Sequence, residues 1–184
     1  MCMGFIEETG AAQYYRDARI LTIYEGTTAI QANDLVGRKT ARDGGKTAKA
    51  IIAQIRKIEE ELVINVDEAG DLAHIQHWLE AATDEFEVVV EYVASNAKAN
   101  IREVFAGSVP YLMLAGIVVG GWNMARAAVI AQRKIAAGDN DPFYNAKIKT
   151  ARFYAEHILA RASGLRCAIT NGAEGVLALT EDQF

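Results

Sequence analysis

A single carboxylate beside a glycine is the group in this sequence best placed to do chemistry. Glu25 lies in the run Tyr24-Glu25-Gly26-Thr27, which separates two segments with helical apolar spacing. A carboxylate at a turn between helices can project into a cleft, because no neighbouring helical turn covers it. Gly26 would let a ligand pass close to the backbone. From the residues alone two interpretations stay open: a glutamate of an ordinary surface loop, or a general base at a substrate cleft.

Two predicted helices hold this turn, in a helix, turn, helix arrangement over residues 4–39. The first covers residues 11–22. Thr27 or Thr28 can cap the second, because a threonine hydroxyl accepts a hydrogen bond from an early helical N–H group. The apolar positions expected on the two helices are Tyr14, Tyr15, Ala18, Leu21, Ile30, Leu35 and Val36.

Apolar residues at helical spacing continue through the rest of the chain, and strand-type alternation is nowhere sustained. The clearest stripe follows Gly70, with Asp71 as a candidate N-cap, and another follows the break at Gly44-Gly45. The two stripes consist of Leu72, Ile75, Leu79, Ala82, Phe86, Val89 and Val93, and of Ile51, Ile52, Ile55, Ile58 and Leu62. The sequence therefore predicts an all-α fold, a helical bundle.

The stretch from Val104 to Ala125 carries no charge and raises the question of a membrane span. About 20 apolar residues can cross a bilayer, but this stretch contains polar residues, and the remainder of the chain is heavily charged. We expect a buried central helix that Pro110 starts or kinks. Small residues at about one-turn spacing would allow a neighbouring helix to approach closely. They are Gly116, Gly120 and Gly121.

Proline, glycine and capping residues mark further helix boundaries. Asp141-Pro142 predicts an N-cap followed by proline at the first helical position. We expect that helix to reach about Ser163 and Gly164 to end it. The segment 40–46 is polar and rich in glycine, so it is the best internal boundary in the chain.

Three linked sequence blocks favour the second interpretation of Glu25, a general base at a substrate cleft. They are Gly4-Phe5-Ile6-Glu7-Glu8, Tyr15-Arg16-Asp17-Ala18-Arg19-Ile20 and Ile23-Tyr24-Glu25-Gly26-Thr27-Thr28-Ala29-Ile30-Gln31. In sequence and spacing they resemble the signature of the acyl-CoA dehydrogenases. The resemblance implies that Glu25 removes the α-proton of an acyl-CoA thioester while the β-hydrogen passes as hydride to flavin N5, which gives a trans-2-enoyl-CoA. It also implies that the backbone N–H of Glu25 stabilises the developing enolate, that Gly26 lies along the acyl-CoA, and that Thr27 contacts FAD. The polar residue that the family often has at Ala29 is missing.

The later part of the chain resembles the extra C-terminal domain of long acyl-CoA dehydrogenases, a subgroup that includes enzymes acting on 3-methylmercaptopropionyl-CoA. The residues that carry this likeness are Gly120-Gly121-Trp122, Asp141-Pro142-Phe143-Tyr144-Asn145-Ala146-Lys147 and Leu179-Thr180-Glu181-Asp182-Gln183-Phe184. We therefore expect two domains. Residues 1–40 would end the dehydrogenase's C-terminal helical domain and carry the base, and residues 41–184 would form the extra helical bundle.

Composition narrows the remaining function classes. A net charge of −5 and a pI near 5.3 argue against nucleic acid and against anionic membrane surfaces as partners. Cys2 and Cys167 lie at opposite ends with no CxxC pair, and no signal peptide is recognisable, so we predict a cytoplasmic protein. His74 and His77 could share a helix face, but no cysteine or carboxylate pattern completes a metal site.

The resemblance also predicts partners. We expect an acyl-CoA substrate, FAD in the full-length protein, an electron-transfer flavoprotein as acceptor and a homodimer. The N-terminal helical domain and the middle β-domain of the family have no counterpart in this sequence. We therefore expect a C-terminal fragment with an intact C-terminus. Alone, this fragment should lack flavin and be inactive. The alternative hypothesis is a non-catalytic helical dimerisation or interaction module.

Overall fold

The computed structural model describes residues 4, 6–24, 26–64 and 70–183, and within these ranges its regular structure is helical throughout. This confirms the predicted all-α class. The α-helices are α1 (Ala11–Ile20), α2 (Thr28–Asp34), α3 (Lys46–Ile64), α4 (Asp71–Asn96), α5 (Ile101–Ala106), α6 (Ser108–Ala136), α7 (Pro142–His157), α8 (Ala162–Asn171) and α9 (Ala173–Leu177). Three short 3-10 helices, η2 (Glu7–Thr9), η4 (Leu159–Arg161) and η5 (Glu181–Gln183), and a π-helix, η3 (Leu35–Ala41), complete the described elements.

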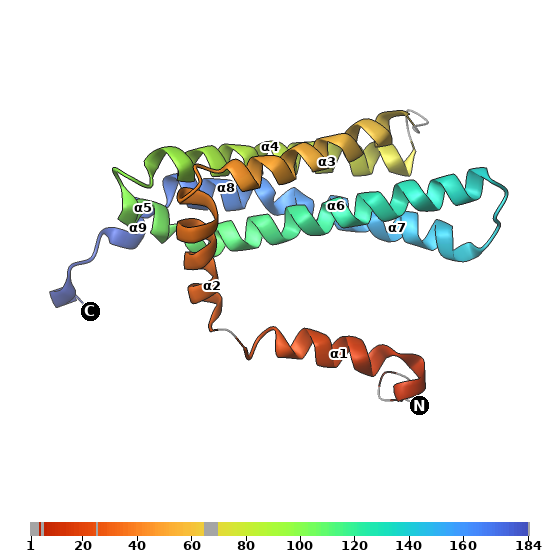
Figure 1. Ribbon diagram of the computed structural model, residues 1–184, viewed down its shortest axis with the longest axis horizontal. Coiled ribbons are helices and arrows are strands. Elements are labelled where there is room, and N and C mark those ends of the chain that lie inside the picture. The colour runs from red at the N-terminus through yellow and green to blue at the C-terminus, as the bar shows by residue number, and fades with distance from the viewer. Residues whose placement is uncertain (1–3, 5, 25, 65–69, 184) are drawn as a thin grey trace.

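The long helices lie lengthwise against one another and form the bundle (Figure 1). α6 packs against α7, α4 and α8, and α3 lies against α4. α2 and η3 cross one end of the bundle, and α1 lies apart from it, on the far side of the turn that precedes α2 (Figure 1). The chain therefore divides into a packed bundle, an arm made of α2 and η3, and a separate N-terminal segment.

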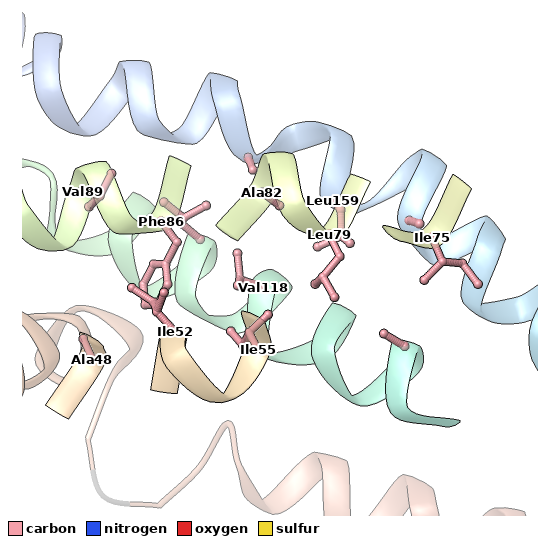
Figure 2. Packing of buried hydrophobic residues seen from close by; sticks show 14 of the residues in the cluster. Ala48, Ile52, Ile55, Ile75, Leu79, Ala82, Phe86, Val89, Val118 and Leu159 are labelled. Atoms are coloured by element: carbon pink, nitrogen blue, oxygen red, sulfur yellow. The ribbon is translucent and has the colours of Figure 1, made fainter. Parts of the chain in front are cut away.

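The predicted apolar stripe of α4 forms the centre of the core. All seven of its members, from Leu72 to Val93, are buried. Figure 2 shows Leu79 and Phe86 of α4 facing Ile52 and Ile55 of α3, with Val118 of α6 beside them. This spacing is confirmed because residues three and four apart share one face of an α-helix.

α6 is the central helix that the uncharged stretch predicts. By length and composition alone it is apolar enough to cross a membrane, and in this structure it packs in the bundle among α4, α7 and α8. Pro110 lies in its first turn, as expected. A Cβ on Gly120 would collide with the Tyr154 hydroxyl, and one on Gly121 would lie 2.7 Å from Cδ2 of Leu159, so both glycines permit close packing. Gly116 does not, since nothing lies within 4 Å of its Cβ position.

Two predicted helix boundaries are wrong. Asp71 does not cap α4: Gly70 takes the cap position without a side-chain hydrogen bond, and the Asp71 carboxylate binds Lys149 and Arg152 of α7 instead. Gly164 does not end α7, which stops at His157 and is followed by η4, while α8 runs through Gly164. The turn at η4 buries Leu159, which packs on Gly121 just after the end of α7.

Other boundaries are confirmed. The Asp141 carboxylate accepts a hydrogen bond from the N–H of Phe143 at 2.9 Å, with Pro142 in the first turn of α7. The Gly44-Gly45 break separates η3 from α3, and both glycines have positive φ angles of 65° and 80°. These conformations favour glycine, which has no Cβ to clash with the backbone.

Candidate functional site

The predicted turn lies between α1 and α2, and Glu25 itself is outside the described residues. Its neighbours Tyr24, Gly26 and Thr27 are described, and all three are exposed. The helix, turn, helix arrangement predicted for this region is therefore confirmed on both sides of residue 25. The proposed role of Glu25 stays a prediction.

Gly26 and Thr27 fix the backbone at the start of α2. Gly26 has a φ of 99°, which only glycine adopts readily, and a Cβ there would lie 3.2 Å from Cγ2 of Ile30. Thr27 is the N-cap, and its hydroxyl accepts the N–H of Ile30 at 3.4 Å. Of the two candidate caps, the structure selects Thr27 rather than Thr28. The cap thus holds Thr27, two residues after the predicted base, and the position between them needs to be glycine.

Large apolar side chains surround this turn without cover. They are Tyr14, Tyr15, Ile20, Leu21, Ile23, Tyr24 and Ile30, each between 47% and 79% exposed. Neither η2 nor α1 contains a buried residue. The amphipathic pattern of residues 11–22 therefore produces a helix, but no residue of α1 becomes buried.

The polar contacts of α1 are with residues close in sequence. Asp17 accepts a hydrogen bond from Gln13 at 2.7 Å, and Gln13 accepts one from Arg16 at 3.0 Å. Arg16 lies 3.8 Å from the carboxylate of Glu7. These groups stabilise the helix itself, and surface pairs of this kind are worth only about 0–1 kcal/mol each.

The arm is held at its other end. Ala32, Val36 and Thr40 are its buried residues, and the Thr40 and Tyr111 hydroxyls lie 2.9 Å apart inside the protein. The Phe86 ring stacks on Tyr111 with centroids 6.0 Å apart. Burial raises the pKa of the Tyr111 phenol, so it stays protonated and able to donate.

Thr40 and Tyr111 are not among the functional residues predicted from the sequence. A signal for Thr40 was present, because it follows Ala32 and Val36 at intervals of four and so continues their stripe. The signal for Tyr111 was weaker: it is a hydroxyl-bearing residue within the uncharged stretch that forms most of α6. Their pairing depends on packing between segments 71 residues apart.

Two of the three C-terminal motifs, those around Gly120 and Asp141, lie in the bundle and serve its packing, whereas residues 179–183 of the third are exposed beyond α9. Gly120 and Gly121 admit Tyr154 and Leu159, and Asp141 caps α7. Trp122 is half-buried beside Arg126, whose guanidinium carbon lies 5.4 Å from the centre of its ring. The structure therefore places Gly26 and Thr27 at the turn and gives Gly120, Gly121 and Asp141 structural roles.

This combination of a signature turn and an α-bundle matches one family of proteins. Residues 2–39 match the family model described as acyl-CoA dehydrogenase, C-terminal domain. Residues 51–180 match the model described as acetyl-CoA dehydrogenase C-terminal like. The chain belongs to the acyl-CoA dehydrogenase family, and it carries the helical C-terminal regions that these models represent.

Individual relatives point the same way. The chain is 44% identical over 176 residues to the 3-methylmercaptopropionyl-CoA dehydrogenase of Ruegeria pomeroyi, covering 95% of this chain and 29% of that protein. It is 31% identical to the broad-specificity linear acyl-CoA dehydrogenase FadE5 of Mycobacterium tuberculosis, covering 98% of this chain and 30% of that one. A butyryl-CoA dehydrogenase of Syntrophomonas wolfei is 29% identical over 98% of this chain and 30% of its own length. The chain thus spans less than a third of the length of these relatives.

Proposed function

We propose that this chain is the C-terminal part of an FAD-dependent acyl-CoA dehydrogenase and supplies the catalytic base, Glu25. The observation that carries the proposal is the Ile23–Gln31 motif at an exposed turn, in a chain 44% identical over 95% of its length to a 3-methylmercaptopropionyl-CoA dehydrogenase. The reaction would introduce a double bond between the α- and β-carbons of an acyl-CoA thioester.

The chemistry requires more than the carboxylate. An α-proton beside a thioester is a weak acid, so the base must be desolvated, which raises its pKa, and the enolate oxygen must receive hydrogen bonds. The exposed apolar side chains around the turn are suited to this, because covering them would exclude water from residue 25. The backbone N–H of Glu25 is the donor to the enolate oxygen that this chain would contribute.

Gly26 and Thr27 fit contacts with substrate and cofactor. Gly26 has no side chain that would block a ligand passing along the backbone, and the atoms nearest to a Cβ built there belong to Ile30. Thr27 uses its oxygen as an acceptor in the cap and keeps its hydroxyl proton available for a donor contact to FAD. When bound, FAD would supply the acceptor for the β-hydrogen, which leaves as hydride.

The partners proposed for the whole protein follow from the same family likeness. They are an electron-transfer flavoprotein that reoxidises the cofactor, and a second copy of the protein in a homodimer. We place this dehydrogenase in the cytoplasm.

The base is tested in the longer dehydrogenase to which these residues would belong, purified with its flavin. Glu25→Gln should keep the flavin absorbance and lower turnover with an acyl-CoA by about 10²–10⁴-fold, the usual contribution of a general base. Glu80→Gln, an exposed glutamate of α4, is the matched control and should leave turnover unchanged. Turnover retained in Glu25→Gln would refute the assignment.

An alternative function is an interaction module that does no chemistry alone. The bare apolar side chains between Tyr14 and Ile30 favour it, because such surfaces mark places where another polypeptide binds. The purified 184-residue chain distinguishes the two behaviours. We expect it to be colourless and to bind neither FAD nor acyl-CoA, whereas flavin absorbance that co-purifies with it would show that it forms a cofactor site by itself.

A further inference from the structure

The arm formed by α2 and η3 touches the bundle along one face. Ala32 and Val36 have no exposed surface and Thr40 is 1% exposed, while Thr28, Ala29 and Ile30 at the other end are exposed. Figure 1 shows the arm crossing the end of the bundle, with the start of α2 pointing away from it. The arm is therefore exposed from Gly26 to Ile30, and it lies against the bundle from Ala32 to its last anchor at Thr40.

A buried pair of hydroxyl groups forms that anchor. Thr40 and Tyr111 are each 1% exposed, and their oxygens lie 2.9 Å apart. Most of the surrounding core is apolar, including Phe86, which stacks on the Tyr111 ring. A buried hydroxyl without a partner is costly, so each group holds the other in place. Apolar contacts tolerate sliding, whereas a hydrogen bond fixes distance and direction.

Thr40 lies in the π-helix η3. The N–H of Arg42 bonds to the carbonyl of Gly37 at 3.1 Å, and the N–H of Gly45 bonds to the carbonyl of Thr40 at 2.9 Å, both spanning five residues. Thr40 follows Val36 at an interval of four, so both residues lie on the same face of the arm, and both are buried. Runs of π-helix are rare, and they occur frequently at functional sites.

We infer that the Thr40–Tyr111 hydrogen bond is a positioning contact through which the bundle sets where the Gly26–Thr27 turn lies. The part of this inference that concerns catalysis rests on the proposed function, whereas the anchoring of the arm does not. Tyr111 and Thr40 touch no reacting atom and act through α2. The bundle of residues 46–177 thereby gains a role in the reaction although its motif residues serve packing.

The geometry makes the anchor sensitive. Residues 28–40 span roughly 15–20 Å at the rise of a helix. A tilt of a few degrees at the anchored end would displace the other end by about 1 Å, and an error of that size at a catalytic group can cost about 100-fold in rate. Loosening the anchor should therefore affect the chemical step more than substrate binding.

The anchoring is tested by amide hydrogen exchange on the 184-residue chain. Tyr111→Phe keeps the ring and removes the hydroxyl, so amides of residues 28–41 should exchange about fivefold to tenfold faster, as expected for loss of one buried hydrogen bond. Tyr154→Phe is the matched control, because it removes a tyrosine hydrogen bond to the Ile117 carbonyl of α6 that does not touch the arm. Exchange in α4 serves as the reference for global destabilisation. Equal exchange of residues 28–41 in Tyr111→Phe and in the control would overturn the inference.

Rescue by a conservative variant guards against trivial misfolding. Thr40→Val removes the hydroxyl at similar size and should accelerate exchange of residues 28–41 as Tyr111→Phe does. Thr40→Ser keeps the hydroxyl and should restore exchange to within about twofold of the parent chain. Thr40→Ser that behaves like Thr40→Val would show that the methyl group, rather than the hydrogen bond, anchors the arm.

The catalytic part is tested in the longer dehydrogenase. There Tyr111→Phe should lower kcat about tenfold to 100-fold with KM changed less than about twofold, and Tyr154→Phe should change neither. An unchanged kcat in Tyr111→Phe, together with a large loss in Glu25→Gln, would overturn the positioning role and leave the proposed function standing. Full turnover in Glu25→Gln would overturn the proposed function, and hydrogen exchange would still decide the anchoring.

Discussion

The N-terminal segment of residues 6–24 and the bundle of residues 46–177 are both helical, but different interactions hold them. The bundle buries continuous apolar stripes, such as that of α4. The segment has no buried residue in η2 or α1 and exposes Tyr14, Tyr15 and Leu21. Helix formation in the segment therefore depends on local propensity and hydrogen bonds, whereas tertiary packing stabilises the helices of the bundle.

Ion pairs show the same contrast. Several ion pairs of the bundle join different helices: Lys149 lies 2.6 Å and Arg152 2.9 Å from the Asp71 carboxylate, across the interface of α7 and α4. Those between α8 and α4, and between α6 and α3, are Arg166–Glu85 at 2.6 Å and Arg133–Glu61 at 2.8 Å. In the segment, the ion pair between Arg16 and Glu7 joins residues close in sequence.

This difference separates stability from the proposed chemistry. The turn with Gly26 and Thr27 belongs to the poorly covered part of the molecule, while the free energy of unfolding comes from the bundle. The arm of α2 and η3 connects the two regions. The following changes test this division, from the largest expected effect to the smallest.

Truncating a core residue should have the largest effect. Leu79 has no exposed surface, and Leu79→Ala should lower the free energy of unfolding by about 3 kcal/mol, because it removes buried methyl groups and leaves a cavity. Leu21 is 66% exposed, so Leu21→Ala should change it by less than about 0.5 kcal/mol. Urea denaturation of both variants measures the difference, and similar losses would contradict the division.

Adding a methyl group to α6 should distinguish two glycines of the same helix. Gly121→Ala should lower stability by about 1–2 kcal/mol, because its Cβ would lie 2.7 Å from Leu159, which is itself 2% exposed and has little room to move. Gly116→Ala meets nothing within 4 Å and should raise stability by up to about 1 kcal/mol through helix propensity. Thermal unfolding monitored by circular dichroism gives both signs, and a stabilising Gly121→Ala would show that this interface is loose.

Removing the Asp71 charge should have a smaller, pH-dependent effect. The hydrogen bond from Lys149, supported by Arg152, holds the pKa of Asp71 below its usual value. A lowered folded-state pKa stabilises the protein above the unfolded pKa of about 3.9, and this contribution is lost as the pH falls through the folded pKa. Asp71→Asn should therefore cost about 1 kcal/mol at pH 7 and progressively less below about pH 4.

The control for the Asp71 substitution is Asp17, in the N-terminal segment. Asp17 accepts a hydrogen bond from Gln13 of its own helix, so Asp17→Asn should change the free energy of unfolding by less than about 0.5 kcal/mol at any pH. Denaturant midpoints measured from pH 3 to pH 7 compare the two variants. A pH-independent loss in Asp71→Asn would show that geometry, rather than charge, makes its contribution.

Deleting residues 1–24 should have the smallest effect on stability. No residue from Glu7 to Tyr24 is buried, so the remaining bundle should unfold within about 0.5 kcal/mol of the full chain. Chemical denaturation of the shortened chain measures this. A loss above about 1 kcal/mol would mean that the segment packs on the bundle in solution, and it would also argue against a separate domain before residue 41.

Much of the fold could be predicted from local pattern. The apolar stripe of α4, the N-cap at Asp141 and the cap at Thr27 all follow from residues within a few positions of one another, and all are confirmed. The two-domain division at residues 40 and 41 stays a prediction. Contacts across that boundary exist, since Thr40 is bonded to Tyr111 of α6.

The incorrect predictions share one cause. Asp71 has the sequence position of a helix cap, but two cations of α7, 78 and 81 residues away, bind its carboxylate. Gly164 has the position of a helix terminator, but the chain turns earlier, where Leu159 can pack on Gly121. In both cases a group distant in sequence outcompetes the local signal.

The sequence by itself determined the helices, their apolar faces and the signature turn around Glu25, because these depend on interactions between near neighbours in the chain. Tertiary structure alone decided which charges pair, where α7 ends, and that Thr40 meets Tyr111. Those outcomes depend on which helices pack side by side, and the residues next to a side chain in sequence do not indicate a partner 70 or more residues away. The turn was therefore predictable as a motif, while the anchor that holds its arm was not.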